Sequence, residues 1–265
     1  MTGSGNDFVM VDGRVTMPAD WTPEDVRTVC SRGTGVGADG VVFVSPGTGL
    51  GAVRMAYFNS DGSHAAMCGN AALCSTRLAV FLGLGSSEGM RLETDAGVYE
   101  SRCPAEGDRA ELRLAPVDAP TSPKVRLAAG EGRAAFAIVG VPHLVVTVED
   151  LDRIDLPARG RALRIDPALG GSGANVNFIG PTGKRTVWAM RTYERGVEGE
   201  TLACGTGAVA AACALREWGL AEFPITLMTK TSLPLVIRAH RKRDGRFEDL
   251  WLEGQGRLVF RGVIS

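Results

Sequence analysis

The stretch Met67–Gly83, MCGNAALCSTRLAVFLG, has a near copy later in the chain, and the pair decides the expected fold. The copy is Ala203–Gly219, ACGTGAVAAACALREWG. In each stretch a cysteine is followed by a glycine and a small polar residue, and an apolar run then ends at a glycine fifteen residues after the cysteine. Alanine and leucine favour helix, and glycine is common just beyond a helix end. The sequence therefore predicts two long helices, over 70–82 and 206–218.

Most of the remaining chain is typical of short strands separated by glycine and proline. Apolar and β-branched runs predict strands over 40–44, 56–59, 110–115, 143–150, 175–180, 186–193, 224–230, 233–240 and 257–264. The segment 115–124, APVDAPTSPK, has three prolines and no apolar periodicity, which predicts a linker. We therefore expect an α+β fold of two similar domains, residues 1–115 and 116–255. The C-terminal strand, about 256–265, is expected to complete the first domain.

Composition and charge argue against several classes of protein. The chain has 29 basic and 30 acidic residues, whereas nucleic-acid binders usually carry a basic excess. The basic segment 238–246 contains Asp244 and fits a solvated turn between strands. No apolar run reaches the roughly 18 residues of a membrane span, and the first residues lack the pattern of a secretory signal. We expect a cytoplasmic protein without nucleic-acid or membrane partners, whose six cysteines are reduced.

The six cysteines divide into two groups. The chain contains no CxxC pair and its three histidines are scattered, so a metal site is not expected. Cys68 and Cys204 each precede a glycine and a capping residue at a predicted helix start. There the unpaired backbone N–H groups and the helix dipole lower a thiol pKa and can also hold a carboxylate. The remaining four fit small buried hydrophobic side chains: Cys30, Cys74, Cys103 and Cys213.

Two activated sulfurs allow two kinds of chemistry. One is a dithiol redox switch. The other is acid–base chemistry on both sides of one carbon: if the domains face each other, a thiolate takes an α-proton while the opposite thiol delivers one. A carboxylate held by both helix N-termini would carry the developing enolate charge, and the product would have the mirror configuration at that carbon.

Other polar motifs flank these cysteines. GTGVGADG, residues 33–40, contains GxGxxG, but a strand follows it, which indicates a tight turn rather than a dinucleotide fingerprint. GSGND (3–7) and FNSDGS (58–63) fit polar turns. Glu194 and Arg195 end a strand before the second cysteine, and can pair with each other or with a substrate's ammonium and carboxylate groups. His143 begins a strand, as a structural or a site histidine.

Taken together, these motifs resemble the diaminopimelate epimerase family. The matching stretches, which span nearly the whole chain in order, are GSGNDF, GVGADG, FNSDGS, MCGNA, GVPH, GANVNF, YERGVEGETLACGTGA and VFRG. The resemblance implies two similar domains, each a mostly antiparallel curled sheet around a central helix, with the active site in the cleft between them. It also implies a homodimer that converts LL-2,6-diaminopimelate to meso-diaminopimelate without PLP or metal, in lysine and peptidoglycan precursor biosynthesis.

The resemblance also implies a role for each matching residue. Cys204 is similar to the base and Cys68 to the acid when the LL form becomes meso, with the roles exchanged in reverse. His143 and Glu194 resemble the pair that tunes the cysteine pKa values. The backbone cradle for the reacting carboxylate is implied at Gly69, Asn70, Gly205 and Thr206. The side chains that orient the substrate are implied to be those of Asn6, Asn59, Asn175, Glu194 and Arg195.

Three positions depart from the family pattern, and two alternative functions remain. Gly40 stands where some members have a glutamine that reaches the substrate, and Val141 stands where many read Asn-Pro-His. Phe260 replaces a tyrosine associated with the dimer contact in some members.

One alternative is a proline racemase-like enzyme acting on another amino acid. The other is a redox-sensing protein in which Cys68 and Cys204 form a reversible disulfide.

Overall fold

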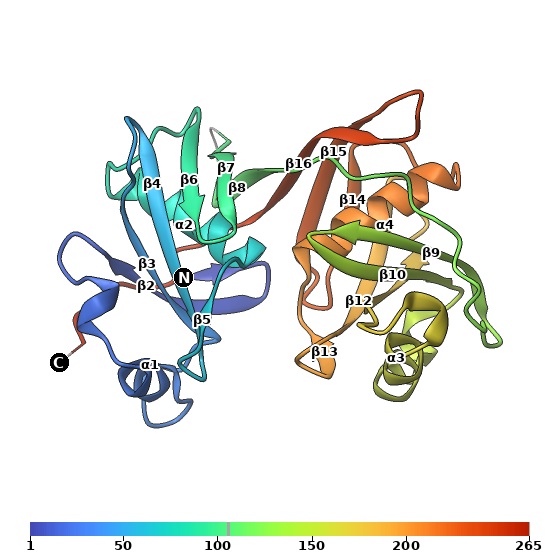
Figure 1. Ribbon diagram of the computed structural model, residues 1–265, viewed down its shortest axis with the longest axis horizontal. Coiled ribbons are helices and arrows are strands. Elements are labelled where there is room, and N and C mark those ends of the chain that lie inside the picture. Colours follow the sequence, from blue (N-terminus) through green and yellow to red (C-terminus); the bar gives the residue numbers. More distant parts are fainter. Residues whose placement is uncertain (105–106, 265) are drawn as a thin grey trace. The chain divides into compact units, whose positions relative to one another are not determined.

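The structure is a computed structural model that describes residues 1–104 and 107–264. The chain divides into two compact units, residues 1–113 with those from 253 onward, and residues 114–252. The sequence placed these divisions after residues 115 and 255. Each unit contains a sheet and one long helix, which Figure 1 labels α2 and α4.

The first unit is built on a mixed sheet. Its strands follow the spatial order β1-β2-β3-β4-β6-β7-β8, and β5 pairs with β4. The pairs β2/β3 and β4/β6 are parallel, whereas β1/β2, β3/β4, β4/β5, β6/β7 and β7/β8 are antiparallel. The strands are β1 (Thr2–Gly3), β2 (Asn6–Asp12), β3 (Gly40–Pro46), β4 (Ala52–Asn59), β5 (His64–Ala65), β6 (Met90–Thr94), β7 (Gly97–Arg102) and β8 (Arg109–Leu114). The helices are η1 (Pro18–Asp20), α1 (Pro23–Cys30) and α2 (Gly69–Phe81).

The second unit is also built on mixed strand pairing, and its last strand, β16, runs past the unit boundary at residue 252. The spatial order is β9-β10-β11-β12-β14-β15-β16, and β13 pairs with β12. The pairs β10/β11 and β12/β14 are parallel. The strands are β9 (Glu131–Val139), β10 (Val141–Val148), β11 (Asn175–Pro181), β12 (Val187–Glu194), β13 (Gly199–Thr201), β14 (Ile225–Met228), β15 (Pro234–Arg241) and β16 (Phe247–Gln255). The helices are η2 (Leu151–Arg153), α3 (Leu156–Arg164), η3 (Pro167–Leu169) and α4 (Gly205–Glu217).

The two units repeat one topology. Each strand order has the same sequence of steps, with parallel pairs in the same two places and a short strand attached to the fourth member. A short helix precedes the third strand of each unit, and the long helix follows the attached strand. The prediction of an α+β fold with two similar domains is confirmed.

The long helix of each unit lies inside a curled sheet. Helix α2 contacts β1 and β7 as well as the strands between them, and α4 contacts β9 as well as β15. A helix that contacts strands near both edges of a sheet requires the sheet to curl around it. Both helices begin and end one residue earlier than predicted, and the glycines that follow them, Gly83 and Gly219, have φ values of 69° and 67°. This left-handed conformation favours glycine and satisfies the last carbonyls of the helix.

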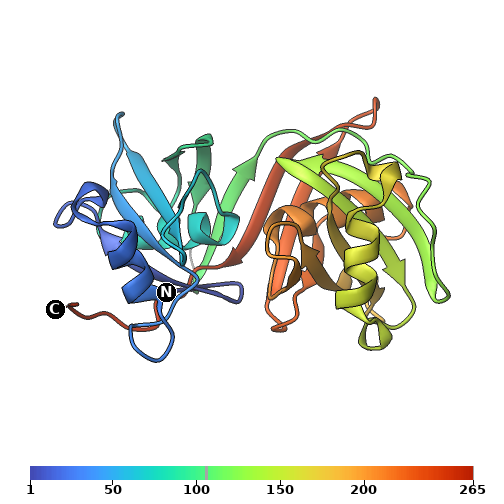
Figure 2. The ribbon, with the colours of Figure 1, turned by 60° about the horizontal axis from the view of Figure 1, so that its bottom comes forward.

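Two shorter helices, α1 and α3, cover the outer faces of the sheets, as Figure 2 shows, and neither was predicted from the sequence. Helix α1 begins with a capping box at Thr22, whose hydroxyl accepts a hydrogen bond from the Asp25 N–H. It packs Val26 and Val29 against β3. Because α2 packs on the other face of β3, five consecutive residues of that strand are buried, Gly40–Val44.

The strand predicted over 257–264 is wrong. Arg257 forms an antiparallel bridge with Thr2, with N–H···O distances of 2.8 Å in both directions, but within the described chain no strand follows it. The apolar residues beyond it are exposed, among them Phe260 at 66%. Strand β1 has only two residues, so this edge of the sheet offers too little backbone to pair with a longer strand.

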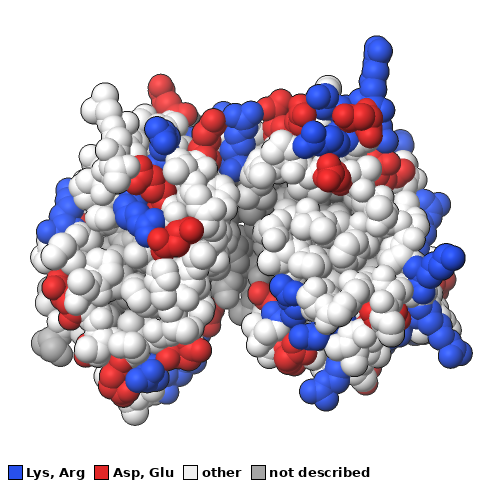
Figure 3. All heavy atoms as spheres, in the orientation of Figure 1, with Lys and Arg blue, Asp and Glu red and all other residues white. Residues whose placement is uncertain are grey.

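The surface carries charges of both signs. Figure 3 shows lysine and arginine interspersed with aspartate and glutamate on the visible face of each unit. The basic segment 238–246 runs from β15 through a turn to β16, as the sequence predicts. Of the helices in the described chain, none has the length and apolar character needed to cross a membrane.

Candidate active site

In the first unit, Cys68 caps the N-terminus of the central helix α2. Its backbone is extended, with φ −144° and ψ 122°, and its carbonyl accepts the first helical hydrogen bond from the Ala72 N–H at 2.9 Å. The sulfur is therefore held where the first N–H groups of the helix, from Gly69 and Asn70, point out of the helix end. The side chain of Cys68 is half-buried. This is the arrangement that the sequence predicts for a thiol at a helix N-terminus.

A chain of three polar side chains lies beside this helix end. Asn70 Nδ2 donates to Asn6 Oδ1 at 2.7 Å, and Asn6 Nδ2 donates to Asp39 Oδ2 at 2.8 Å. Arg32 in turn donates to Asp39 Oδ1 at 3.0 Å. The structure thus brings two of the predicted substrate residues, Asn6 and Asn70, into direct contact.

The carboxylate at the end of this chain fixes the direction of both amides. A carboxylate only accepts hydrogen bonds, so Asn6 must turn its Nδ2 toward Asp39 and its Oδ1 toward Asn70. Asn70 must then donate, which leaves its own Oδ1 as an acceptor. The Asn70 side chain is buried, and its Oδ1 has no hydrogen-bond partner among the described residues. Because a buried acceptor without a partner is costly, this oxygen is suited to accept an N–H from a ligand.

Asn59 and Gly40 lie at the same end of the sheet. Gly40 pairs with Asn59 on one side and with Phe8 on the other, and the Ser60 N–H donates to the Asp39 carbonyl at 3.1 Å. The Asn59 side chain donates to Ser63 Oγ at 3.0 Å in the following turn. A Cβ added to Gly40 would lie 2.4 Å from the carbonyl oxygen of the residue before Asn59. This backbone therefore has no room for the glutamine that some family members carry at position 40.

In the second unit, Cys204 caps the central helix α4 in the same way. Its backbone is extended, with φ −134° and ψ 107°, and its carbonyl accepts from the Ala208 N–H at 2.9 Å. Here the sulfur itself accepts a hydrogen bond from the Gly207 N–H at 3.4 Å. Cys204 is buried, and the Thr206 hydroxyl oxygen lies 3.7 Å from its sulfur. Two hydrogen-bond donors can thus stabilise a thiolate at this position.

His143 lies behind Thr206 and is fully buried. Its Nε2 is 3.0 Å from Thr206 Oγ1, and its Nδ1 is 3.3 Å from Asn177 Nδ2. Burial lowers the pKa of His143 to about 3, and the positive charge of Arg195 lowers this pKa further in the same direction. The imidazole is therefore neutral at neutral pH, so it can orient a neighbouring hydroxyl but does not supply a positive charge.

Asn175, Glu194 and Arg195 occupy adjacent strand ends. Asn175 pairs with His143 across β10 and β11, and its Oδ1 accepts from the Arg195 backbone N–H at 2.8 Å. The Arg195 guanidinium donates to the Ser172 carbonyl at 3.4 Å. Burial raises the pKa of Glu194, and the nearby Thr201 hydroxyl opposes this rise.

The other four cysteines favour the protonated thiol. Burial raises the pKa of Cys74 to about 12, and it also raises the pKa of Cys213, Cys30 and Cys103. All six cysteines are free thiols in the structure. Over residues 1–104 and 107–264, the structure contains no cluster of three or more His, Cys, Asp or Glu side chains able to hold a metal.

The predicted site residues therefore form two groups, one in each unit. Three residues that support them were missed: Asp39, Asn177 and Gly207. Asp39 lies in the GVGADG turn that the sequence placed near a site. Asn177 follows Asn175 by two positions in β11, so strand alternation alone could have placed both side chains on one face. The sequence carries no comparable signal for Gly207.

Comparisons with known proteins find relatives that match most of the chain. The sequence model of the family described as Diaminopimelate epimerase matches residues 1–117 and 135–231. A diaminopimelate epimerase of Gemmatimonas aurantiaca is 45% identical to this chain over 275 residues, which cover 100% of this chain and 98% of that protein. Another, from Archaeoglobus fulgidus, is 39% identical over 277 residues, which cover 100% of this chain and 94% of that protein.

Solved structures with the same fold have lower sequence identity. A PhzF-family phenazine biosynthesis protein of Bacillus anthracis has a TM-score of 0.66 at 17% identity, covering 97% of this chain and 91% of that one. A hydroxyproline epimerase of Agrobacterium vitis has a TM-score of 0.64 at 17% identity, covering 96% of this chain and 86% of that one. These two likenesses concern the fold alone. On the sequence matches, which span nearly its whole length, the chain belongs to the diaminopimelate epimerase family.

Proposed function

We propose that the chain converts LL-2,6-diaminopimelate to meso-diaminopimelate, as an isomerase of lysine and peptidoglycan precursor biosynthesis. The observation that carries the proposal is the pair of equivalent helix ends: in each unit the cysteine before the central helix is the N-cap residue. A structural cysteine has no reason to take this position twice, whereas a two-base reaction needs two sulfurs of similar setting. The identities to diaminopimelate epimerases support the substrate class.

The proposed reaction exchanges one proton at the α-carbon. Cys204, as a thiolate, takes the α-proton of the LL substrate, and the electron pair of the C–H bond moves into the carboxylate as an enediolate. The Cys68 thiol then delivers its proton to the opposite face of the carbon, which inverts the configuration. The products are meso-diaminopimelate, a Cys204 thiol and a Cys68 thiolate, and the reverse reaction exchanges these roles.

The helix N-termini stabilise the charge that develops during this exchange. The first N–H groups of α2 and α4, from Gly69 and Asn70 and from Gly205 and Thr206, are proposed to hold the reacting carboxylate. Negative charge on its oxygens increases in the transition state, so hydrogen bonds from these N–H groups strengthen there. The chemistry requires neither PLP nor a metal. The proposal requires the two half-sites to face each other across a cleft when substrate is bound.

The remaining polar residues are proposed to recognise the rest of the substrate. Glu194 offers a carboxylate to an ammonium group, and Arg195 offers a guanidinium to a carboxylate. The buried Oδ1 of Asn70 accepts an ammonium N–H, with Asn6 holding its amide in that direction. The amides of Asn59, at the end of β4, and of Asn175, at the start of β11, are proposed to add further hydrogen bonds to the substrate. Such a set suits a substrate with two amino-acid ends.

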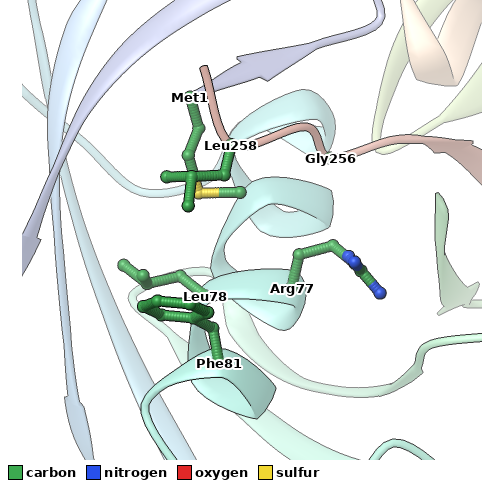
Figure 4. Close-up of a pocket in the computed structure, with 6 residues that line it drawn as sticks. All are labelled: Met1, Arg77, Leu78, Phe81, Gly256 and Leu258. Atoms are coloured by element: carbon green, nitrogen blue, oxygen red, sulfur yellow. The ribbon is translucent and has the colours of Figure 1, made fainter. Parts of the chain in front are cut away.

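We further propose a homodimer formed through the first unit. Its C-terminal residues expose apolar side chains, including Val259 at 54% and Phe260 at 66%. Beside them, a small cavity of about 50 Å³ lies near the last turns of α2, lined by Met1, Arg77, Leu78, Phe81, Gly256 and Leu258 (Figure 4). Cys68 is at the opposite end of this helix, so the surface does not compete with substrate. A cytoplasmic location belongs to the same proposal, because the mechanism needs reduced thiols.

A substrate panel tests the proposed function. The reduced protein is incubated with LL-diaminopimelate and separately with L-proline, L-histidine and L-glutamate, and stereoisomers are resolved by chiral chromatography. We expect turnover of diaminopimelate alone. Racemisation of another amino acid with diaminopimelate unchanged would favour the racemase alternative. Absence of turnover on every substrate, with a Cys68–Cys204 disulfide forming reversibly instead, would favour the redox alternative.

A further inference from the structure

Asn177 is a buried amide in the middle of β11 whose contacts reach the site without touching the sulfur. Its side chain is fully buried. Its Oδ1 accepts from the Thr192 hydroxyl at 3.0 Å, and its Nδ2 lies 3.2 Å from the Leu144 carbonyl and 3.3 Å from His143 Nδ1. Each polar atom of the amide therefore has a partner inside the second unit.

The Leu144 carbonyl fixes which way this amide points. A carbonyl oxygen only accepts hydrogen bonds, so the atom facing it must be the NH₂ group of Asn177. The Thr192 hydroxyl satisfies the opposite end, because it can donate to Oδ1. Reversing the amide would place two acceptors against each other at Leu144 in a fully buried position, which is costly.

The orientation of Asn177 in turn determines the tautomer of His143. The ring nitrogen Nδ1 faces an N–H donor, so in the neutral imidazole Nδ1 must be the unprotonated acceptor. The ring proton is then on Nε2. Because Nε2 faces Thr206 Oγ1 at 3.0 Å, the histidine donates to the threonine hydroxyl.

The direction of this hydrogen bond determines how Thr206 interacts with Cys204. Once its oxygen accepts from His143, its own proton is free to point at the Cys204 sulfur, 3.7 Å away. The Gly207 N–H, at 3.4 Å, is a second donor to the same sulfur. In the other tautomer, with the proton on Nδ1, the Nε2 lone pair would draw the Thr206 proton away from Cys204.

We propose that Asn177 is a positioning residue: it holds His143 as the Nε2–H tautomer, which makes Thr206 a donor to Cys204 and keeps Cys204 as the thiolate of the resting enzyme. Cys68 then carries the proton that the reaction requires, so the free enzyme is set to accept the LL substrate. This inference rests on the proposed function for its consequence in catalysis, but the tautomer itself does not depend on any substrate.

Gly207 provides the space that the arrangement needs. A Cβ at this position would lie 2.2 Å from Asn177 Oδ1 and 3.1 Å from the Cys204 sulfur. The amide and the sulfur therefore approach the first turn of α4 more closely than any residue with a side chain would allow.

The direct test is ¹⁵N NMR of the protein labelled at histidine, which distinguishes the two neutral tautomers. We expect the Nε2–H form of His143 in the unmodified protein. In Asn177→Asp the carboxylate accepts from the ring, so the proton should move to Nδ1. Ile179→Val, a mild change two positions along the same strand, is the matched control and should keep the Nε2–H form.

The second measurement is the alkylation rate of Cys204 by iodoacetamide at mildly acidic pH, in a Cys68→Ala background. We expect Asn177→Asp to slow alkylation at least ~10-fold, because the thiolate loses the Thr206 hydrogen bond, while Ile179→Val leaves the rate unchanged. An Nδ1–H tautomer in the unmodified protein overturns the proposal even if Asn177→Asp does not fold. Unchanged alkylation in folded Asn177→Asp also overturns it. Since neither measurement uses diaminopimelate, failure of the epimerase assay alone would reject only the proposed function.

Discussion

Replacing Gly207 with alanine tests how tightly the second half-site is packed. The added Cβ would lie 2.2 Å from Asn177 Oδ1, about 1 Å inside an ordinary contact, so something must move. Asn177 is held by its bonds to Thr192, Leu144 and His143, and displacing it leaves buried groups unpaired at about 1–3 kcal/mol each. Alanine regains up to about 1 kcal/mol of helix propensity. We expect a net loss of ~2–4 kcal/mol in unfolding free energy.

The same substitution should reduce activity, because the Gly207 N–H donates to the Cys204 sulfur. Weakening one hydrogen bond to a charged group costs about 1.5–3 kcal/mol, which corresponds to roughly a 10–100-fold loss in kcat. Urea unfolding and the epimerase assay measure the two effects. Gly89→Ala is the control, since a Cβ there meets nothing within 4 Å. A Gly207→Ala protein as stable and as active as the parent would refute the packing described here.

Three further predictions concern charge and association. The folded-state pKa of His143, about 3, lies below its usual 6.5, so the unfolded chain binds a proton first as pH falls. Stability is therefore lost between roughly pH 6.5 and 3 at up to ~1.4 kcal/mol per unit, and His143→Gln should flatten this slope in pH-dependent unfolding. Asp39→Ala frees the Asn6 amide to rotate, so KM for diaminopimelate should rise about 10-fold with a smaller change in kcat; equal loss in both would contradict a binding role. Phe260→Glu should convert the proposed homodimer to monomer by light scattering, and an unchanged mass would place the interface elsewhere.

The two central helices could be predicted from the sequence because their signals are local. Composition, the capping position and the terminal glycine all lie within one stretch of chain, and the observed ends differ from the predicted ones by one residue. The repeat of those stretches was also the basis of the two-domain prediction. The predicted strand over 257–264 failed for the opposite reason. Its apolar pattern is typical of a strand, but pairing depends on the partner edge, and Thr2–Gly3 is too short to supply one.

The contacts of the supporting residues in the second unit could not be predicted, because they depend on register between distant strands. His143 lies opposite Asn175, and Asn177 lies opposite Thr192, only once β10, β11 and β12 are paired. The sequence motif identified Asn175 but not the residue two positions further on, which contacts the histidine. The close approach of Asn177 and Cys204 to Gly207 could not be predicted from the sequence either, because a glycine in the first turn of a helix has many local explanations.

The two-base mechanism is tested most directly by following α-deuterium in D₂O with each cysteine replaced in turn. In the unmodified protein, meso-diaminopimelate formed from the LL isomer should carry one solvent deuterium at the inverted carbon, because the proton removed by Cys204 and the one delivered by Cys68 belong to different sulfurs. Cys68→Ala and Cys204→Ala should each abolish epimerisation. Cys74→Ala is the control and should retain it, because Cys74 is a buried thiol within α2, the helix that Cys68 caps. Epimerisation that continues in either of the first two variants, or product that retains its original α-hydrogen, would contradict the mechanism.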